Sequence, residues 1–241
     1  MLPGDGLGDS TNRYSSTVMV NASTAAGKSK CNGVILAPRL VLTAGHCVCR
    51  SRDCAENATV TTVTYPPARG SLDLVMGARY EERRGTVRPH PSLELRHGDN
   101  AASSSTRADL ALIFLNQPLG STFPAVPLAN AEARAGESIT LVGYGRQDAS
   151  DRVLGVRRFG VKKITSVREG GGFLEPHGLI ALNSGSGEPC LRQEGAQEVL
   201  VGIANSHSGD KPTFTSVYPH REWLLSEIHR ATHVGAEESS P

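Results

Sequence analysis

The sequence has no charge imbalance, no long apolar run and few aromatic residues. Its 241 residues include 25 Lys and Arg against 24 Asp and Glu, a formal net charge of +1, so no overall field draws it to nucleic acid or anionic lipid. The pairs Arg83-Arg84 and Arg157-Arg158 are typical of solvated surface, and no aromatic platform accompanies them. The apolar run Leu110–Leu115 is far too short to cross a bilayer. We expect neither a nucleic-acid partner nor a membrane span.

The first six residues lack the cationic start and apolar stretch of a secretory signal. The cysteines nevertheless favour an oxidising compartment. Four of the five, Cys31, Cys47, Cys49 and Cys54, fall within 24 positions, which is typical of two local disulfides. Three pairings are possible, and the sequence does not choose among them. We expect a secreted, periplasmic or extracellular protein whose signal was removed, with an intracellular location as the alternative.

A zinc site is the rival interpretation of these cysteines. It would combine Cys47, Cys49 and Cys54 with His46. Because the spacing Cys-x-Cys-x4-Cys does not match the common zinc motifs, we expect no metal and no cofactor.

Long amphipathic helical repeats are nearly absent, whereas 26 glycines and 14 prolines provide many turns. This combination predicts an all-β architecture of many short strands. The runs that predict strands are Thr17–Val20, Gly33–Leu36, Leu40–Thr43, Val60–Thr64, Leu72–Val75, Leu110–Leu115, Ser138–Tyr144, Val156–Ile164, Gly178–Leu182 and Val199–Ala204.

Three polar segments interrupt this pattern. Residues 1–13 are rich in Gly and Asp without periodicity, which predicts a flexible N-terminal arm, and His97–Thr106 has the composition of a surface loop. Residues 232–241 predict a frayed tail.

A change of period near the C-terminus predicts one helix over residues 219–231. Pro219 suits the first helical turn, and Trp223, Leu224 and Ile228 can share one apolar face.

The strongest chemical signal is the run Val41–Cys47, which reads Val-Leu-Thr-Ala-Gly-His-Cys. A strand ends, the chain turns, and His46 is presented beside a cysteine able to bridge back to Cys31, sixteen residues earlier. A bridge closing such a loop stabilises a fold by about 3 kcal/mol on chain-entropy grounds. It would also fix the turn that aims His46, whose imidazole is well suited to taking and returning a proton near neutral pH.

Asp109 directly precedes the apolar run Leu110–Leu115, where a carboxylate is awkward to bury without a partner. Such a carboxylate can accept the Nδ1 proton of a histidine and hold the ring in the useful tautomer. A strand-end Asp that only caps a turn is the alternative. The histidine motif favours the catalytic interpretation.

Ser186 lies between Gly185 and Gly187. Flanking glycines allow a tight turn and leave room for a substrate carbonyl near the hydroxyl. Backbone N–H groups in such a turn can stabilise an oxyanion by about 3 kcal/mol per donor. On its own, a Ser/Gly loop is more often only a turn.

Together these motifs resemble the trypsin/chymotrypsin (S1) family of serine peptidases over residues 14–230. The residues follow the family order His, Asp, Ser. The matching runs are Leu42–Cys47, Asp109–Leu112 and Ser186–Pro189, with weaker support from His90-Pro91, Gly143–Gly145 and Pro212–Val217.

The resemblance implies one peptidase domain made of two six-stranded antiparallel β-barrels. The first barrel would occupy residues 14–120 and carry His46 and Asp109. The second would occupy residues 121–218 and carry Ser186, with the C-terminal helix after it.

The resemblance also implies roles for the site residues. Ser186 would attack a peptide carbonyl and form an acyl-enzyme, with His46 as general base and then acid and Asp109 orienting the ring. The N–H groups of Ser184 and Ser186 would form the oxyanion hole. A monomer would bind a polypeptide substrate or a protein inhibitor. Its substrate pocket would be lined by Ile180, Asn205, Ser206, His207 and Thr213.

The nucleophile loop departs from the family pattern Gly-Asp-Ser-Gly-Gly-Pro at three positions. Ser184 replaces the oxyanion-hole glycine, and Gly185 replaces the aspartate that pairs with a new N-terminus after activation cleavage. No Ile-Val-Gly-Gly-like start is present, so we expect no activation by N-terminal insertion. Glu188 replaces the second glycine, and its carboxylate is expected either to be solvated or to raise the pKa of His46.

Other departures concern the substrate pocket. Ile180 at the pocket floor favours an uncharged pocket, without a preference for Lys or Arg. Leu182 replaces a cysteine, which leaves Cys190 as a buried free thiol. Asn205 replaces a serine that supports the Asp, and its amide can do similar work.

Two functions follow from this mixture. The first is an active serine endopeptidase, because all three triad residue types occur in the family order. The second is a catalytically weak or inactive homologue that binds a protein partner through the cleft between the two barrels, where the family holds its substrate. The substitutions at positions 184, 185 and 188 favour the second, because intact triad side chains cannot compensate for a collapsed oxyanion hole.

Overall fold

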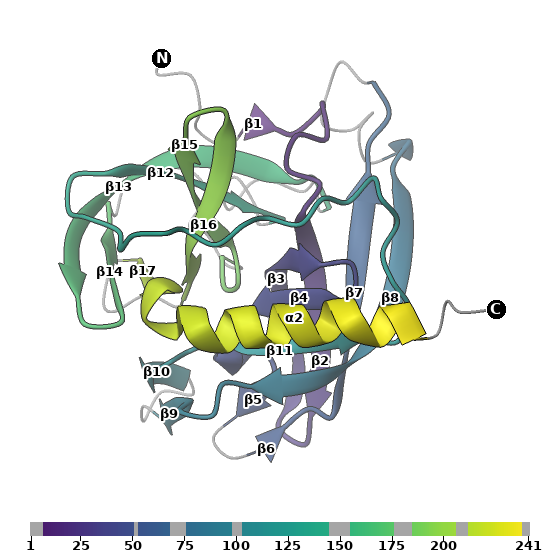
Figure 1. Ribbon diagram of the computed structural model, residues 1–241, viewed down its shortest axis with the longest axis horizontal. Coiled ribbons are helices and arrows are strands. Elements are labelled where there is room, and N and C mark those ends of the chain that lie inside the picture. The colour runs from purple at the N-terminus through teal and green to yellow at the C-terminus, as the bar shows by residue number, and fades with distance from the viewer. Residues whose placement is uncertain are drawn as a thin grey trace.

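Strands follow one another along most of the chain, and two sets of them close into barrels in the computed structural model shown in Figure 1. The structure describes residues 7–50, 53–67, 76–97, 103–144, 155–175, 185–205 and 212–237. The predicted strands Leu72–Val75 and Gly178–Leu182 lie outside these ranges.

The first barrel holds six antiparallel strands in the order β11-β4-β3-β2-β7-β8, and pairing between β8 and β11 closes the ring. Side chains alternate between the two faces of each strand, and the inward Val20, Val60 and Leu112 are fully buried. The strands are β2 (Thr17–Thr24), β3 (Gly27–Ala37), β4 (Leu40–Thr43), β7 (Asn57–Thr64), β8 (Arg79–Pro89) and β11 (Ala111–Leu115).

The second barrel closes in the same way. Its six strands run in the order β13-β12-β15-β16-β17-β14, and β13 pairs with β14 to complete the ring. The strands are β12 (Ser138–Gly143), β13 (Arg158–Arg168), β14 (Gly171–Leu174), β15 (Pro189–Glu194), β16 (Gln197–Ala204) and β17 (Thr213–Ser216). With helix α2 (Arg221–Glu237) after them, the two rings confirm the predicted all-β fold of two six-stranded antiparallel barrels and a C-terminal helix.

Two short hairpins lie outside the barrels. One joins β5 (Cys49–Arg50) to β6 (Asp53–Cys54), and the other joins β9 (Glu94–His97) to β10 (Ser103–Arg107). The surface loop predicted over His97–Thr106 is therefore wrong for its second half. β10 consists of polar residues without apolar alternation, so only backbone pairing with β9 defines it.

From residue 7 onward the N-terminal arm is bonded to the second barrel. β1 (Leu7–Gly8) pairs with the start of β13, and Asp9 is buried against Arg157. Arg157 has no solvent exposure and Arg158 very little, so the prediction of a solvated arginine pair is wrong here. A guanidinium in the interior needs a carboxylate partner, and Asp9 in the arm provides it.

Helix α2 runs across the first barrel, as the yellow ribbon in Figure 1 shows. The 3-10 turn η2 (Tyr218–His220) leads into it, and Leu224 and Ala231 are buried apolar residues of the helix. Arg88 of β8 donates hydrogen bonds of 2.8 and 3.0 Å to the carboxylate of Glu227. These contacts hold the helix on the barrel.

The helix extends beyond its predicted end at residue 231. Thr232 donates a hydrogen bond of 2.8 Å to the carbonyl of Ile228, and Nδ1 of His233 lies 2.8 Å from the carbonyl of His229. The helix continues to Glu237, so the first residues of the predicted frayed tail are helical. None of the described helices has the length and apolar character that crossing a membrane requires.

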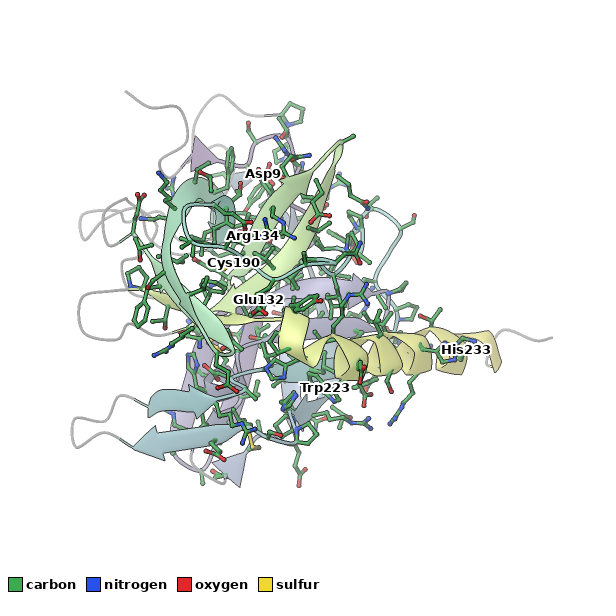
Figure 2. All side chains as sticks on the ribbon, turned by 60° about the vertical axis from the view of Figure 1, so that its left-hand side comes forward. Asp9, Glu132, Arg134, Cys190, Trp223 and His233 are labelled. Atoms are coloured by element: carbon green, nitrogen blue, oxygen red, sulfur yellow. A yellow bond between two sulfur atoms is a disulfide. The ribbon has the colours of Figure 1, made fainter. Side chains whose placement is uncertain are left out.

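An aromatic cluster joins the start of α2 to the end of β8. The ring of His90 packs edge-on against Trp223, which Figure 2 labels, and against His220, each with ring centroids 4.5 Å apart. Burial, followed by the charges of His220 and Arg107, lowers the pKa of His90 to about 4. His90 therefore stays neutral in the folded protein at pH values where the unfolded chain takes up a proton.

Replacing His90 by Phe should reduce the acid sensitivity of folding. A histidine whose pKa is depressed contributes stability that is present above 6.5 and lost as the pH falls toward about 4. Between pH 7 and pH 5 the apparent Tm of His90→Phe should fall less than that of the wild type in thermal unfolding followed by circular dichroism. His233→Phe, which changes an exposed histidine of α2, should behave like the wild type. An equal loss of Tm in His90→Phe would contradict this assignment.

Candidate active site

His46 and Asp109 meet at the edge of the first barrel through two hydrogen bonds. Nδ1 of His46 lies 2.7 Å from Oδ2 of Asp109, and the backbone N–H of His46 donates to Oδ1 at 2.8 Å. Asp109 is almost fully buried, and the imidazole is largely so. Burial alone lowers the pKa of His46, but the charge and hydrogen bond of Asp109 outweigh it, so the pKa is raised above 6.5.

Local backbone geometry aims both side chains. His46 lies in the 3-10 turn η1 (Gly45–Cys47), which is separated from the end of β4 by Ala44 alone. Before Asp109, Ala108 has a φ of 47°, a left-handed conformation that is costly for a residue with a Cβ. The N–H of Leu110 bonds to the carbonyl of Ala108 at 2.7 Å, so the turn points the Asp109 carboxylate back toward His46.

Disulfides fix the end of the turn that carries His46 and the chain that follows it. Cys31 pairs with Cys47, and Cys49 pairs with Cys54. The ligand atoms of Cys31, His46 and Cys47 lie within 4.8 Å of one another. Because both sulfurs are joined in a disulfide, this group has no free thiolate to offer a metal, and the zinc interpretation loses its ligands.

The Ser186 loop packs against the first barrel at Asn32, the neighbour of Cys31. The carbonyl of Ser186 accepts hydrogen bonds from the backbone N–H of Asn32 at 2.9 Å and from its Nδ2 at 3.2 Å. Gly187 has a φ of +82°, and a Cβ there would lie 2.0 Å from the carbonyl oxygen of Asn32. Only glycine fits this turn, so the loop can approach the barrel closely.

Ser186 and His46 do not bond directly, although both belong to the described part of the chain. Nε2 of His46 lies 4.0 Å from Sγ of Cys47. The Ser186 loop is linked to the neighbourhood of His46 through the first barrel, because the Ser186 carbonyl bonds to Asn32 and the adjacent Cys31 is bridged to Cys47, the residue after His46. Catalytic hydrogen bonds are often loose without substrate and tighten in the complex.

Glu188 is buried inside the second barrel, so neither expectation for this residue agrees with the structure. A Cβ on Gly143 would lie 2.1 Å from its Oε1, and that oxygen has no hydrogen-bond partner among the described residues. Burial raises the pKa of Glu188 well above 4.5, against the opposing charge of Lys162. Glu188 is absent from the groups that shift the pKa of His46.

The proposed pocket residues are described only in part. Asn205 donates through Nδ2 to Oγ1 of Thr215 at 2.8 Å, and its backbone N–H bonds to the carbonyl of Thr213. The amide that was expected to support Asp109 is thus turned toward β17. Four predicted site residues lie outside the described ranges, namely Ile180, Ser184, Ser206 and His207.

Cys190 is a free thiol buried in the second barrel and is labelled in Figure 2. Burial, and then the nearby Glu188, raises the pKa of this thiol. It is therefore held in the unreactive protonated form in the folded protein.

Sequence reasoning missed Asn32, which contacts both the nucleophile loop and Tyr144 at the end of β12. Oδ1 of Asn32 accepts a hydrogen bond of 2.9 Å from the backbone N–H of Tyr144. The sequence offered one indication of this role. Asn32 directly follows Cys31, and a bridge from Cys31 to Cys47 places this part of the chain near His46.

Replacing Glu188 by Gln should stabilise the protein at high pH. A carboxyl whose pKa is raised contributes stability that is complete below its ordinary value of 4.5 and lost as the pH rises through the raised pKa. The Tm of Glu188→Gln should exceed that of the wild type at pH 8, and the gap should close at pH 4. Glu132→Gln, at an exposed loop carboxylate, should follow the wild type at both pH values. A lower Tm for Glu188→Gln at pH 8 would instead indicate a carboxylate stabilised by Lys162.

Comparison with known proteins agrees with this fold. The Trypsin family model matches residues 6–224. The structure is similar to that of GrC, with a TM-score of 0.66 and 18% identity over 94% of this chain and 99% of that chain. It is also similar to a scabies mite inactivated protease paralogue, with a TM-score of 0.67 and 17% identity over 94% of this chain and 99% of that chain. A search of curated protein sequences gave no match.

At these identities the structural likenesses show the fold alone, whereas the family match spans most of the sequence. Both barrels also have the topology that the motifs predicted. The chain therefore belongs to the trypsin family.

Proposed function

We propose that the protein is a serine endopeptidase that hydrolyses peptide bonds through an acyl-enzyme. The observation that carries this proposal is the double hydrogen bond between Asp109 and His46, beside a segment bonded to the Ser186 loop. A buried carboxylate that accepts from Nδ1 leaves Nε2 free to act as a base.

In the proposed reaction Ser186 Oγ attacks the carbonyl carbon of the scissile peptide while Nε2 of His46 takes the hydroxyl proton. His46 then gives that proton to the leaving amine as the C–N bond breaks. Water then attacks the acyl-enzyme carbonyl, with His46 again acting as base and then acid. This step releases the acid product and restores the Ser186 hydroxyl. Asp109 holds the imidazole in one tautomer and stabilises the imidazolium at each stage.

The oxyanion would be stabilised by the N–H groups of Ser186 and Ser184. The two bonds from Asn32 to the Ser186 carbonyl fix the peptide plane that follows the nucleophile. A fixed loop favours preorganised donors, which stabilise the transition state without reorganising during the reaction.

The proposed substrate is an extended polypeptide with an uncharged residue for the pocket at Ile180, and the same cleft would accept a protein inhibitor. We propose that a monomer acts outside the reducing cytosol. Two disulfides beside the site support this compartment.

The second candidate function is an inactive homologue that binds a protein through the same cleft. The observations that favour it are the missing hydrogen bond between Ser186 and His46 among the described residues and the buried Glu188 beneath the loop. The similar scabies mite protein is described as an inactivated protease paralogue. A test of nucleophilicity separates the two functions.

Fluorophosphonate labelling provides that test. The wild type should react through Ser186, whereas Ser186→Ala should not be labelled above background, as followed by a fluorescent probe on denaturing gels. Asp109→Asn should keep the serine but label about 10⁴-fold more slowly, because the imidazole loses its tautomer. Equal labelling of wild type and Ser186→Ala would rule out the endopeptidase and leave the binding function.

The pH dependence of labelling should report His46. A general base must be neutral, so the rate should rise with pH to a midpoint above 6.5, because Asp109 raises the pKa of His46. In Asp109→Asn the residual rate should have its midpoint at lower pH. A midpoint shared by the two proteins would argue that another group controls the reaction.

A further inference from the structure

A buried polar cluster lies at the junction of the N-terminal arm with both barrels. At its centre is Arg157, which has no solvent exposure. Nε of Arg157 donates to Asp9 at 2.8 Å, and Nη1 donates to the phenol oxygen of Tyr144 at 2.9 Å and to the carbonyl of Val63 at 3.1 Å. Its Nη2 donates to Oδ1 of Asn12 at 3.3 Å. An arginine cannot shed its charge by deprotonation, so these contacts must compensate for its burial.

The arm is organised around the carboxylate of Asp9. This group also accepts hydrogen bonds from the backbone N–H groups of Arg13 and Tyr14, both at 2.9 Å. The backbone N–H of Asp9 bonds to the carbonyl of Arg157 at 2.8 Å. Figure 2 labels Asp9 at this end of the molecule. The geometry of the arm and the direction of the guanidinium are therefore set together.

Tyr144 links the guanidinium of Arg157 to the first barrel through hydrogen bonds. Its phenol oxygen accepts from Arg157 and donates to the carbonyl of Thr17 at 3.1 Å. Its backbone N–H donates to the side chain of Asn32 at 2.9 Å. Both ends of the tyrosine are thereby fixed, one by the buried charge and the other by Asn32.

Asn32 makes the last contact. Its Oδ1 accepts from Tyr144 and its Nδ2 donates to the carbonyl of Ser186. The amide group of Asn32 cannot rotate without losing both bonds. A displacement of the Tyr144 backbone would therefore move this amide, and with it the peptide plane that follows Ser186. The four side chains come from four segments: the arm, the residue before β13, the residue after β12, and β3. Hydrogen bonds link them from Asp9 to the Ser186 carbonyl, with the covalent frame of Tyr144 joining its phenol to its backbone N–H.

We propose that Asp9, Arg157, Tyr144 and Asn32 form a buried relay through which the N-terminal arm positions the Ser186 loop for acylation. The proposal rests on the endopeptidase function, because positioning matters only if Ser186 is a nucleophile. All four are positioning residues, and none contacts the reacting atoms. A misplacement of about 1 Å in such a loop can slow a reaction by about a hundredfold.

The relay can be tested with variants that weaken single links. Tyr144→Phe removes the phenol bonds and keeps the ring, Asn32→Ala removes the last side-chain link, and Asp9→Asn removes the charge that pairs with Arg157. Each should slow fluorophosphonate labelling by about tenfold to a hundredfold, measured well below its Tm. Each should also speed hydrogen exchange of the amides of Asn32 and Gly187, measured by mass spectrometry, which does not require activity.

A double variant separates positioning from stability. In Asp9→Leu/Arg157→Met the buried pair becomes apolar, a replacement that often preserves or raises stability. Its Tm should exceed that of Asp9→Asn, yet labelling should stay slow and loop exchange fast, because the directional bonds are absent. Recovery of the wild-type labelling rate and exchange in this variant would overturn the relay.

Glu227→Gln is the control, because it weakens another interelement ion pair, between the buried Glu227 and the exposed Arg88. It should lower Tm without changing labelling or loop exchange, and a change as large as that of Tyr144→Phe would also overturn the relay. If the wild type labels no faster than Ser186→Ala, the proposed function fails. Exchange at Asn32 and Gly187 then still decides whether the four residues hold the loop.

Discussion

The contact between Asn32 and the Ser186 carbonyl is the constraint on which the proposed chemistry depends. His46 and Asp109 belong to the first barrel and Ser186 to the second, so a site exists only where the two rings are held in register. Apolar packing between barrels tolerates small sliding movements, whereas two hydrogen bonds to one carbonyl do not. The absence of a side chain at Gly187 allows this close approach.

Much of the fold could be predicted because inward apolar alternation marks the central strands. Leu40–Thr43 matches β4 at both ends, and Asp109 lies two residues before β11, where its position suggested a buried carboxylate. Strand β8 was missed because Glu81, Glu82 and Arg84 face solvent and Gly85 is its one buried residue. Nothing in such a run distinguishes a barrel strand from a polar loop.

The buried charges escaped prediction for a different reason. Arg157 and Asp9 are 148 residues apart in sequence, and neither has a local feature that marks it as interior. Two adjacent arginines usually remain solvated, since burying a charge is costly without a partner. The partner is visible only when the arm and the second barrel are seen together. Glu188 is similar, because the space for its carboxyl is provided by Gly143 on another strand.

The buried thiol of Cys190 has a consequence for recovery from heat. In the folded protein it is protonated and shielded from both disulfides. Unfolding exposes it, its pKa returns toward about 8.5, and its thiolate can attack Cys49–Cys54 or Cys31–Cys47. Chains that unfold at alkaline pH would then exchange their bridges and refold poorly. At strongly alkaline pH this exchange would make thermal unfolding irreversible, with a midpoint that depends on heating rate, whereas neutral or acidic buffer would suppress it by keeping the thiol protonated.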